Sequence, residues 1–376
     1  MSANTKHIVL VNHTRELHGS ELVMLETLRQ LRAQGWRVTL VLPINRPAGG
    51  LEQAVGTDAD ILYLRYKNSG EGGLRSLFVE AYNLPALLHF IRWIHENHVD
   101  AIYSNTSVNL LGIEAARWTH TPHIWHWHEL PSLEFGWQKS SILLLKYWHR
   151  FTNRLLFISE NQQQYWEHAL GTSPLRQATV VYNPTRTIRA QRTENQGTVR
   201  IGYVGSFADR KNLPWLIGAV KKLAKQYKVH LSLYGAHDQR EIVKMQALWP
   251  DSAAMSVQLH TSDVEKVYAY LDIFVLPSLS ETMPLVVLEA MQAAVCVIQT
   301  NQSGMTELMQ DGEQCLFIQP DDKNSLYDAL TRCMDDNFRT TIATRGQLFA
   351  NQWIEQNDYG RSIMAVFNNL LTRVTP

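Results

Sequence analysis

Two glutamates, eight positions apart, bracket the point where a buried strand passes into a helix. Glu281 lies in the loop after the apolar run 273–276, which predicts a strand, and Glu289 lies about one and a half turns into the following helix. Pro284 suits the first turn of that helix, where its missing N–H costs nothing. Because N–H groups at a helix start attract anions, this spacing favours a ligand with a diphosphate flanked by hydroxyl groups, such as a nucleotide sugar.

A structural role for the first glutamate is the alternative. Ser278 and Glu281 have the spacing of a capping box, in which Glu281 would only close the start of a helix. That arrangement would place Pro284 inside the helix, where it removes a hydrogen bond and clashes with the preceding turn. The binding interpretation is therefore favoured.

A lysine in the second half of the chain suits the same chemistry. Lys211 follows the predicted strand 199–204 and stands six residues after Gly205. When a nucleotide sugar is cleaved, its diphosphate gains negative charge, and a nearby ammonium stabilises that charge without transferring a proton. The alternative is a solvated loop lysine, which most lysines are.

Residues of the first half offer weaker signals. Gly19 allows a ligand to approach the backbone closely, or it marks a plain turn between strand and helix. Glu21 suits either an acceptor hydroxyl or the helix start. His128 is a candidate donor to a sugar hydroxyl or a phosphate, and it shares a strand face with His126.

The histidine pair and an acidic pair raise the question of a metal. His126 and His128 have no third ligand at suitable spacing. The segment 58–60 reads Asp-Ala-Asp, a spacing that can bind a metal, but here it precedes a strand and is better interpreted as a turn. We expect no metal.

Composition limits the protein class. A chain of 376 residues exceeds the usual size of one core, so two domains are expected. The 35 basic and 35 acidic side chains balance, so nothing indicates a nucleic-acid binder. Three scattered cysteines favour a reducing compartment such as the cytoplasm. The polar start, residues 1–6, shows no signal peptide, and no apolar run is long enough to span a membrane.

Strands alternate with helical patterns, which predicts an α/β fold with parallel sheets. Strands are expected at 7–11, 38–42, 61–64, 101–104, 124–127, 155–158, 180–182, 199–204, 229–234, 257–260, 273–276, 295–298 and 316–318. Helices are expected at 21–34, at 263–270 with a capping box of Ser262 and Glu265, and in the tail 352–372. The polar segment 185–197 is interpreted as a linker. The expected domains are 1–185, 186–355 and a final helix, 356–376, that packs back on the first domain.

In this order, the motifs resemble the retaining glycosyltransferases of family 4, which have the GT-B fold of two facing, doubly wound Rossmann-like domains. The resemblance covers nearly the whole chain. Its most specific part is the Glu-x7-Glu motif, Glu281 to Glu289. The weaker parts are the segments 18–21, 127–129, 158–160, 182–184, 203–212 and 303–307.

The resemblance implies a role for each site residue. Glu281 would contact the transferred sugar near the reacting carbon, Glu289 the ribose hydroxyls, and Lys211 the diphosphate. Residues 282–285 (Thr282, Met283, Pro284 and Leu285) would border the phosphates, where the N–H groups of Met283 and Leu285 flank the site. The family usually has an arginine after the glycine of the second-domain loop, but Ser206 follows Gly205 here. Arg210, from the same loop, is the hypothetical substitute.

The implied function is retaining transfer of a sugar from a UDP- or GDP-sugar to a saccharide or lipid-linked acceptor, without a metal, in cell-surface polysaccharide synthesis. A sugar-nucleotide epimerase of the same architecture and a non-catalytic nucleotide-sugar binding protein are the alternatives. A Rossmann oxidoreductase is disfavoured because no Gly-x-Gly-x-x-Gly follows the first strand of either half. The apolar, aromatic and basic stretch 142–151 suits peripheral contact with the inner face of a membrane, although a core helix is favoured.

Overall fold

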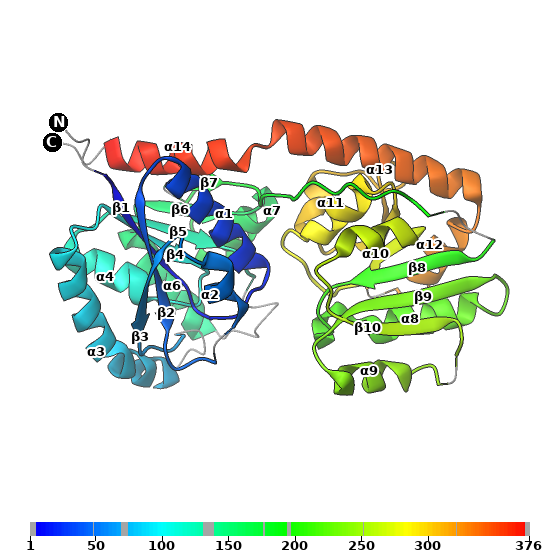
Figure 1. Ribbon diagram of the computed structural model, residues 1–376, viewed down its shortest axis with the longest axis horizontal. Coiled ribbons are helices and arrows are strands. Elements are labelled where there is room, and N and C mark those ends of the chain that lie inside the picture. The colour runs from blue at the N-terminus through cyan, green and yellow to red at the C-terminus, as the bar shows by residue number, and fades with distance from the viewer. Residues whose placement is uncertain are drawn as a thin grey trace. The chain divides into compact units, whose positions relative to one another are not determined.

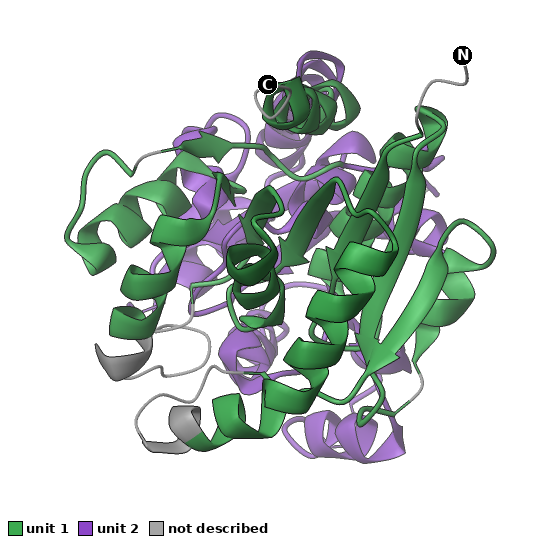
Figure 2. Ribbon diagram, turned by 90° about the vertical axis from the view of Figure 1, so that its left-hand side faces the viewer, with its two compact units in different colours: residues 1–184, 358–376 green, residues 185–357 purple. Residues whose placement is uncertain are grey.

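The computed structural model describes residues 5–47, 49–68, 74–130, 139–175, 177–193, 197–250, 252–320 and 322–372. The chain forms two compact units, coloured separately in Figure 2: unit 1 comprises residues 1–184 and 358–376, and unit 2 comprises residues 185–357. Residues 1–4 of the polar start, 194–196 of the predicted linker and 373–376 of the predicted final helix lie outside the described residues.

Unit 1 is built on a seven-stranded parallel sheet (Figure 1). The strand order is β3-β2-β1-β4-β5-β6-β7. The strands are β1 (His7–Val11), β2 (Arg37–Pro43), β3 (Asp60–Leu64), β4 (Ala101–Asn105), β5 (His123–Trp127), β6 (Arg154–Phe157) and β7 (Ala178–Val180). The helices are α1 (Gly19–Ala33), α2 (Gly50–Val55), α3 (Leu74–Glu96), α4 (Leu111–Thr119), α6 (Lys139–Trp148), η1 (His149–Phe151), α7 (Glu160–Leu170) and α14 (Tyr359–Thr372).

Both faces of this sheet are buried, as parallel strands require. Along β1, Ile8 and Leu10 belong to the apolar cluster that contains α1 and α14, whereas Val9 and Val11 belong to the cluster under α3 and α4. This alternation follows from the two-residue period of a strand. A third cluster holds Trp125, Trp127 and Trp166 with α6 and α7. These three tryptophans are therefore core residues, whereas Trp118 is 65% exposed.

The last helix belongs to unit 1. The hydroxyl of Tyr359 lies 2.5 Å from that of Thr27, and Phe367 stacks on Tyr103. The predicted helical tail 352–372 is confirmed except for one break, because α13 (Asp336–Gln356) ends within it and α14 begins at Tyr359. The side-chain amide of Asn357 donates to the carbonyl of Trp353, and the carboxylate of Asp358 accepts the N–H of Arg361. Such short polar side chains compete with helical hydrogen bonds and interrupt the helix.

Unit 2 is built on a six-stranded parallel sheet of order β10-β9-β8-β11-β12-β13. The strands are β8 (Val199–Val204), β9 (Val229–Ala236), β10 (Met255–Leu259), β11 (Ile273–Leu276), β12 (Cys296–Thr300) and β13 (Leu316–Ile318). The helices are η2 (Asp209–Lys211), α8 (Leu213–Leu223), α9 (Gln239–Gln246), α10 (Val264–Tyr270), α11 (Leu285–Gln292), η3 (Gly304–Glu307), α12 (Ser325–Arg332) and α13.

Two predicted details are corrected. The N-cap of α10 is Asp263, whose carboxylate accepts the N–H of Lys266, rather than Ser262. The acid is the stronger acceptor, and Glu265 instead binds the N–H of Arg189. Strand β7 spans residues 178–180, so the prediction of 180–182 is shifted by two positions.

Both sheets reverse their strand order beside their first strand. In unit 1 the reversal lies between β1 and β4, and in unit 2 it lies between β8 and β11. Loops after the carboxyl ends of such strands diverge and leave a crevice, which is the usual ligand site of open α/β sheets. The candidate residues of each unit are therefore sought there.

Candidate functional site

The loop after β8 has a fixed conformation. Gly205 has a φ of +148°, and a Cβ at this position would lie 2.7 Å from the Tyr203 hydroxyl, so the turn requires glycine. The Gly205 N–H donates to the carbonyl of Tyr234 at 3.0 Å, and the Tyr203 hydroxyl donates to the carbonyl of Ser206 at 2.7 Å. These contacts position η2, which presents Arg210 and Lys211.

Lys211, Arg210 and Glu281 come together at the reversal point of the second sheet. The ammonium of Lys211 donates to Oε1 of Glu281, and Arg210 Nη1 lies 3.6 Å from Oε2. The two basic residues follow β8 and the acid follows the adjacent strand β11, so the fold brings together residues 70 positions apart. Arg210 also donates to the carbonyl of Ser280 at 3.4 Å. The structure thus places the hypothetical substitute arginine beside the predicted acid and ammonium.

Backbone bonds hold Glu281 in its loop. Its N–H donates to the carbonyl of Gln302 at 2.8 Å, and its carbonyl accepts the N–H of Gly304 at 3.1 Å. The turn 303–307, which carries a family-like motif, therefore lies directly against Glu281. Because α11 begins only at Leu285, Glu281 does not close its start, and the capping-box alternative is wrong.

The carboxyl of Glu281 is charged in spite of its burial. Burial alone would raise its pKa, but the charges of Lys211 and Arg210 outweigh burial and hold the pKa below its ordinary value. The site is thus a compact set of two cations and one anion. Two cations held beside an acid are groups that suit a diphosphate, and binding of a diphosphate here stays a prediction.

The segment before α11 differs slightly from expectation. Pro284 is the N-cap, with φ −75° and ψ 106°, so it stands just before the first turn rather than in it. Thr282 and Met283 precede it, and Leu285 is the first helical residue. Phosphate contact by residues 282–285 stays a prediction.

Glu289 has strong partners that sequence reasoning did not foresee. Arg186 grips its carboxylate with two hydrogen bonds of 2.7 and 2.9 Å, and the Tyr268 hydroxyl donates to Oε2 at 3.0 Å. Burial would lower the pKa of Arg186, but Glu289 outweighs it and raises that pKa. Arg186 stands in the predicted linker, and nothing in its local sequence indicates a partner 103 positions away.

In unit 1, α1 begins at Gly19, where a Cβ would meet no protein atom within 4 Å. Packing therefore does not demand glycine at this position. Glu21 is fully buried and accepts from the N–H of His18 at 3.2 Å and the hydroxyl of Ser20 at 3.1 Å. Of its two interpretations, the structure supports the one in which Glu21 secures the helix start.

His128 is buried just beyond β5. Burial, assisted by the nearby His13, lowers the pKa of His128 to about 3, so its ring is neutral near neutral pH. Both of its ring nitrogens are buried without a hydrogen-bond partner among the described residues. The ring of His126 lies 4.1 Å away and bonds the Tyr103 hydroxyl at 2.7 Å. A neutral imidazole donates at one nitrogen and accepts at the other, which suits a sugar hydroxyl.

The acidic segment after α2 has an ordinary structural role. Asp58 lies in a turn, with its N–H bonded to the carbonyl of Val55, and Asp60 pairs with Arg37 at 3.1 Å. Within the described ranges, no group of three histidine, cysteine, aspartate or glutamate side chains is arranged to hold a metal. Metal-independent chemistry stays a prediction.

The stretch 142–151 forms most of α6 and η1. Leu145 is buried in the third apolar cluster, as expected for a core helix, while Leu143 is 64% exposed and Tyr147 is 43% exposed. The guanidinium of Arg117, on α4, lies 4.2 Å from the ring centre of Phe151. None of the described helices combines the length and apolar content that crossing a bilayer requires.

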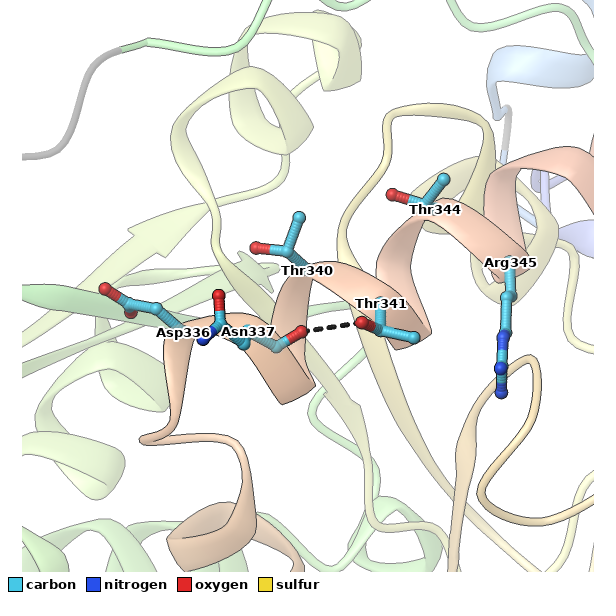
Figure 3. Close-up of a pocket in the computed structure, with 6 residues that line it drawn as sticks. All are labelled: Asp336, Asn337, Thr340, Thr341, Thr344 and Arg345. Atoms are coloured by element: carbon cyan, nitrogen blue, oxygen red, sulfur yellow. Dashed lines mark hydrogen bonds between the residues drawn. The ribbon is translucent and has the colours of Figure 1, made fainter.

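A shallow hollow lies along α13, far in sequence from the predicted residues (Figure 3). Its lining consists of Asp336, Asn337, Thr340, Thr341, Thr344 and Arg345. All six residues lie on one helix, and the hydroxyl of Thr341 donates to the backbone carbonyl of Asn337 at 2.8 Å, within the same helix. This hollow has no convergent groups from a second element and is not a candidate site.

Two family models match the chain. Residues 17–189 match the model described as Glycosyltransferase Family 4, and residues 198–336 match the model described as Glycosyl transferases group 1. Together they cover the second sheet, all of the first sheet except β1, and the Glu281–Glu289 segment.

Individual relatives are distant. The lipopolysaccharide core biosynthesis glycosyltransferase LpsE of Rhizobium meliloti is 30% identical over 38% of this chain and 42% of its own length. The UDP-Gal:α-D-GlcNAc-diphosphoundecaprenol α-1,3-galactosyltransferase of Escherichia coli is 22% identical over 68% of this chain and 71% of its own. The matches to the first three curated relatives span only 38% to 46% of those proteins' lengths.

Solved structures match over nearly the whole chain. The crystal structure of HepE from Anabaena, in complex with UDP-glucose, has a TM-score of 0.77 at 19% identity and covers 97% of this chain and 100% of its own. The glycosyltransferase WaaG, involved in lipopolysaccharide biosynthesis, has a TM-score of 0.68 at 13% identity, covering 96% of this chain and 99% of its own. The fold is thus that of GT-B enzymes. By both family models and by fold, the chain belongs to family 4 of the glycosyltransferases.

Proposed function

We propose that this protein is a retaining glycosyltransferase that moves a sugar from a nucleotide-diphosphate sugar to a saccharide or lipid-linked acceptor. The convergence of Lys211, Arg210 and Glu281 at the carboxyl ends of β8 and β11 carries the proposal. Two cations in a crevice beside a helix start suit a diphosphate, and a charged acid beside them suits the hydroxyls of the attached sugar.

In the proposed reaction, the bond between the sugar carbon and the diphosphate oxygen breaks while the cations stabilise the charge on the leaving group. The acceptor hydroxyl attacks the same face of the sugar, and its proton passes to the departing phosphate. No protein nucleophile is needed, so the residues named here orient and stabilise the reactants. Neutral His128 would bind a sugar hydroxyl without adding charge.

Related proteins suggest the substrates to try. HepE was crystallised with UDP-glucose, the galactosyltransferase is named for UDP-Gal, and another relative, from Mycolicibacterium smegmatis, is named as GDP-mannose-dependent. LpsE and the capsular polysaccharide relative CapM are named for the synthesis of cell-surface polysaccharides. We extend that role to this protein, and its three buried free thiols fit a reducing compartment such as the cytoplasm.

A thermal-shift screen with UDP, GDP and ADP and their sugars tests donor binding, because a ligand that binds only the folded state raises the unfolding temperature. The binding donor is then incubated with and without saccharide acceptors. Retention predicts a product whose anomeric configuration, read by NMR, matches the donor. Failure of every nucleotide to stabilise the protein would contradict the proposal.

The epimerase alternative makes a different prediction in the same assay. An epimerase releases free nucleotide and an altered sugar without any acceptor. A non-catalytic binding protein shows stabilisation but no turnover. Acceptor-dependent release of the nucleotide separates the transferase from both.

A lipid-linked acceptor would bring the enzyme to a membrane, and the exposed part of α6 suits such contact. Leu143 and Tyr147 are exposed there, and Trp118 of α4 is 65% exposed beside Arg117. Aromatic and basic side chains together favour an anionic bilayer surface. Sedimentation with vesicles of anionic and of neutral phospholipid tests this: binding only the anionic vesicles is expected, and its loss in Trp118→Ser would identify the surface.

A further inference from the structure

The carboxylate of Glu289 is engaged by protein groups at three of its acceptor positions. Arg186 Nε donates to Oε1 at 2.7 Å and Nη2 donates to Oε2 at 2.9 Å, while the Tyr268 hydroxyl donates to Oε2 at 3.0 Å. A carboxylate offers about four such positions, two on each oxygen. One position therefore remains, on Oε1.

One position cannot satisfy the two neighbouring hydroxyls of a ribose. For both hydroxyls to bind Glu289, one of its protein donors must leave. Tyr268 is fully buried and its ring packs edge-on against Phe274, so it has nowhere to go. The side chain of Arg186 is 50% exposed and can turn into solvent. Arg186 is therefore the hydrogen-bond donor that releases Glu289.

We propose that Arg186 is a built-in competitor of the donor nucleoside: it holds Glu289 between turnovers, gives way to the ribose diol, and speeds release of the nucleotide product when it returns. This inference rests on the proposed function, together with the expectation from the family resemblance that Glu289 binds the ribose hydroxyls. The guanidinium of Arg186 and the ribose diol each offer two hydrogen bonds. The buried carboxylate therefore has hydrogen-bond partners both before and after the exchange.

The backbone around Arg186 stays in place during such an exchange. The side-chain amide of Gln292 accepts the N–H of Ile188 at 2.9 Å and donates to the carbonyl of Arg186 at 2.9 Å. Gln292 lies three positions after Glu289 on α11, so the same helix presents both contacts. Only the arginine side chain has to move, which makes the exchange a local event.

The test is isothermal titration of wild type and Arg186→Gln with UDP, or the diphosphate that the screen identifies, and with its 2′-deoxy form. If Arg186 competes with the diol, Arg186→Gln binds the ribonucleotide about threefold to tenfold tighter, the range expected for a half-exposed ion pair. The 2′-deoxy form, with one hydroxyl left for Glu289, binds both proteins equally. In kinetics, the variant shows a lower donor KM and stronger inhibition by the nucleotide product.

Arg189→Gln is the matched control, because Arg189 lies on the same segment and its contact with Glu265 uses only its backbone N–H. It is expected to bind both nucleotides as wild type does. Arg186→Lys keeps a cation but loses the two-pronged grip, and an intermediate gain is expected. This second variant keeps the test decisive if Arg186→Gln does not fold.

Weaker binding of the ribonucleotide by Arg186→Gln, or an equal gain for the 2′-deoxy form, overturns the competitor role. Unchanged affinity in both Arg186 variants also overturns it, while leaving the proposed function intact if wild type binds the nucleotide. If wild type binds none of UDP, GDP and ADP, the proposed function itself fails and the inference fails with it.

Discussion

The sheet in each unit is parallel and reverses its strand order beside its first strand. The side chains near that reversal carry different charges in the two units. In unit 2, the crevice residues are ions held in pairs, Lys211 with Glu281 and Arg186 with Glu289. In unit 1, the buried groups at the matching edge are acids such as Glu21 and neutral histidines such as His128. Paired ions can exchange their partners for a diphosphate and a ribose, whereas neutral imidazoles suit uncharged hydroxyls. If the two units bind their ligands as proposed, the difference between them lies in side-chain chemistry and not in architecture.

The largest effect is expected from breaking the charged crevice. Lys211→Ala removes the cation proposed to stabilise the leaving diphosphate, and kcat should fall by about 10²- to 10³-fold, the usual cost of losing one such group. Lys225→Ala, on an exposed turn of the same unit, is the control and should leave the rate unchanged. Initial rates of acceptor-dependent nucleotide release measure both. A Lys211→Ala enzyme that keeps more than a tenth of the wild-type rate would show that the crevice charge is dispensable.

The neutral histidines of unit 1 should make that unit sensitive to acid. Burial lowers the pKa of His123 and of His128 to about 3, and it lowers that of His126 well below its ordinary value. The unfolded chain therefore takes up protons that the folded unit refuses, and the free energy of unfolding falls as pH drops below 6.5. Each histidine contributes up to about 1.4 kcal/mol per pH unit, so we expect the three together to lower the free energy of unfolding of unit 1 by up to about 6 kcal/mol at pH 5.

Limited proteolysis at pH 7.5 and pH 5, with cleavage sites mapped by mass spectrometry, separates the two units. Unit 1 should become the more susceptible at pH 5. In His128→Asn, one histidine fewer takes up a proton on unfolding, so the rise in proteolytic susceptibility from pH 7.5 to pH 5 should be smaller. His89→Asn, at an exposed position, should behave as wild type. Equal acid sensitivity of the two units would contradict the destabilising effect assigned to the buried histidines of unit 1.

An acid in unit 1 also stays uncharged. Burial and the neighbouring carboxyl of Glu80 raise the pKa of Glu114 to about 9. The folded unit keeps a proton that the unfolded chain releases, so this stability is present below pH 4.5 and is lost as pH rises towards 9. Glu114→Gln should therefore be more stable than wild type at pH 8, by up to about 4 kcal/mol, and similar at pH 5. The midpoints of urea unfolding at both pH values measure this stability difference. A difference that does not change with pH would contradict the raised pKa of Glu114 as its cause.

The smallest effect concerns the substitute arginine. If Arg210 supplies the phosphate contact that Ser206 lacks, Arg210→Ala should weaken binding of the nucleotide diphosphate by about threefold to tenfold. Titration calorimetry measures the Kd, and Arg240→Ala, at an exposed position on α9, is the matched control. An unchanged Kd would remove Arg210 from the site and leave Lys211 as the cation that matters.

Much of this architecture follows from local sequence. Apolar runs such as 7–11, 199–204, 273–276 and 316–318 coincide with strands, because a strand buried on both faces needs continuous apolar residues. The meeting of Lys211 with Glu281 follows from the same logic, since both residues come after strand ends and parallel strands present those ends at one edge. The nucleotide-sugar expectation came from the spacing of Glu281 and Glu289, and the GT-B expectation came from the resemblance to a known family.

Other features depend on the path of the chain and could not be predicted. The grip of Arg186 on Glu289 exists because the segment after Pro184 runs along α11, which no local pattern encodes. The break between α13 and α14 rests on two polar residues that also occur within helices. The neutrality of His128 comes from burial, a property of the packed unit rather than of its neighbours in sequence.

The return of α14 to unit 1 has a consequence for synthesis on the ribosome. Residues 185–357, the whole of unit 2, emerge before the helix that completes the core of unit 1. Until Tyr359, Ile363 and Phe367 are translated, the apolar side chains against which they pack, including Met24, stay uncovered on the nascent chain. We therefore expect that unit 2 can finish folding before unit 1, whose core is completed only by the last helix.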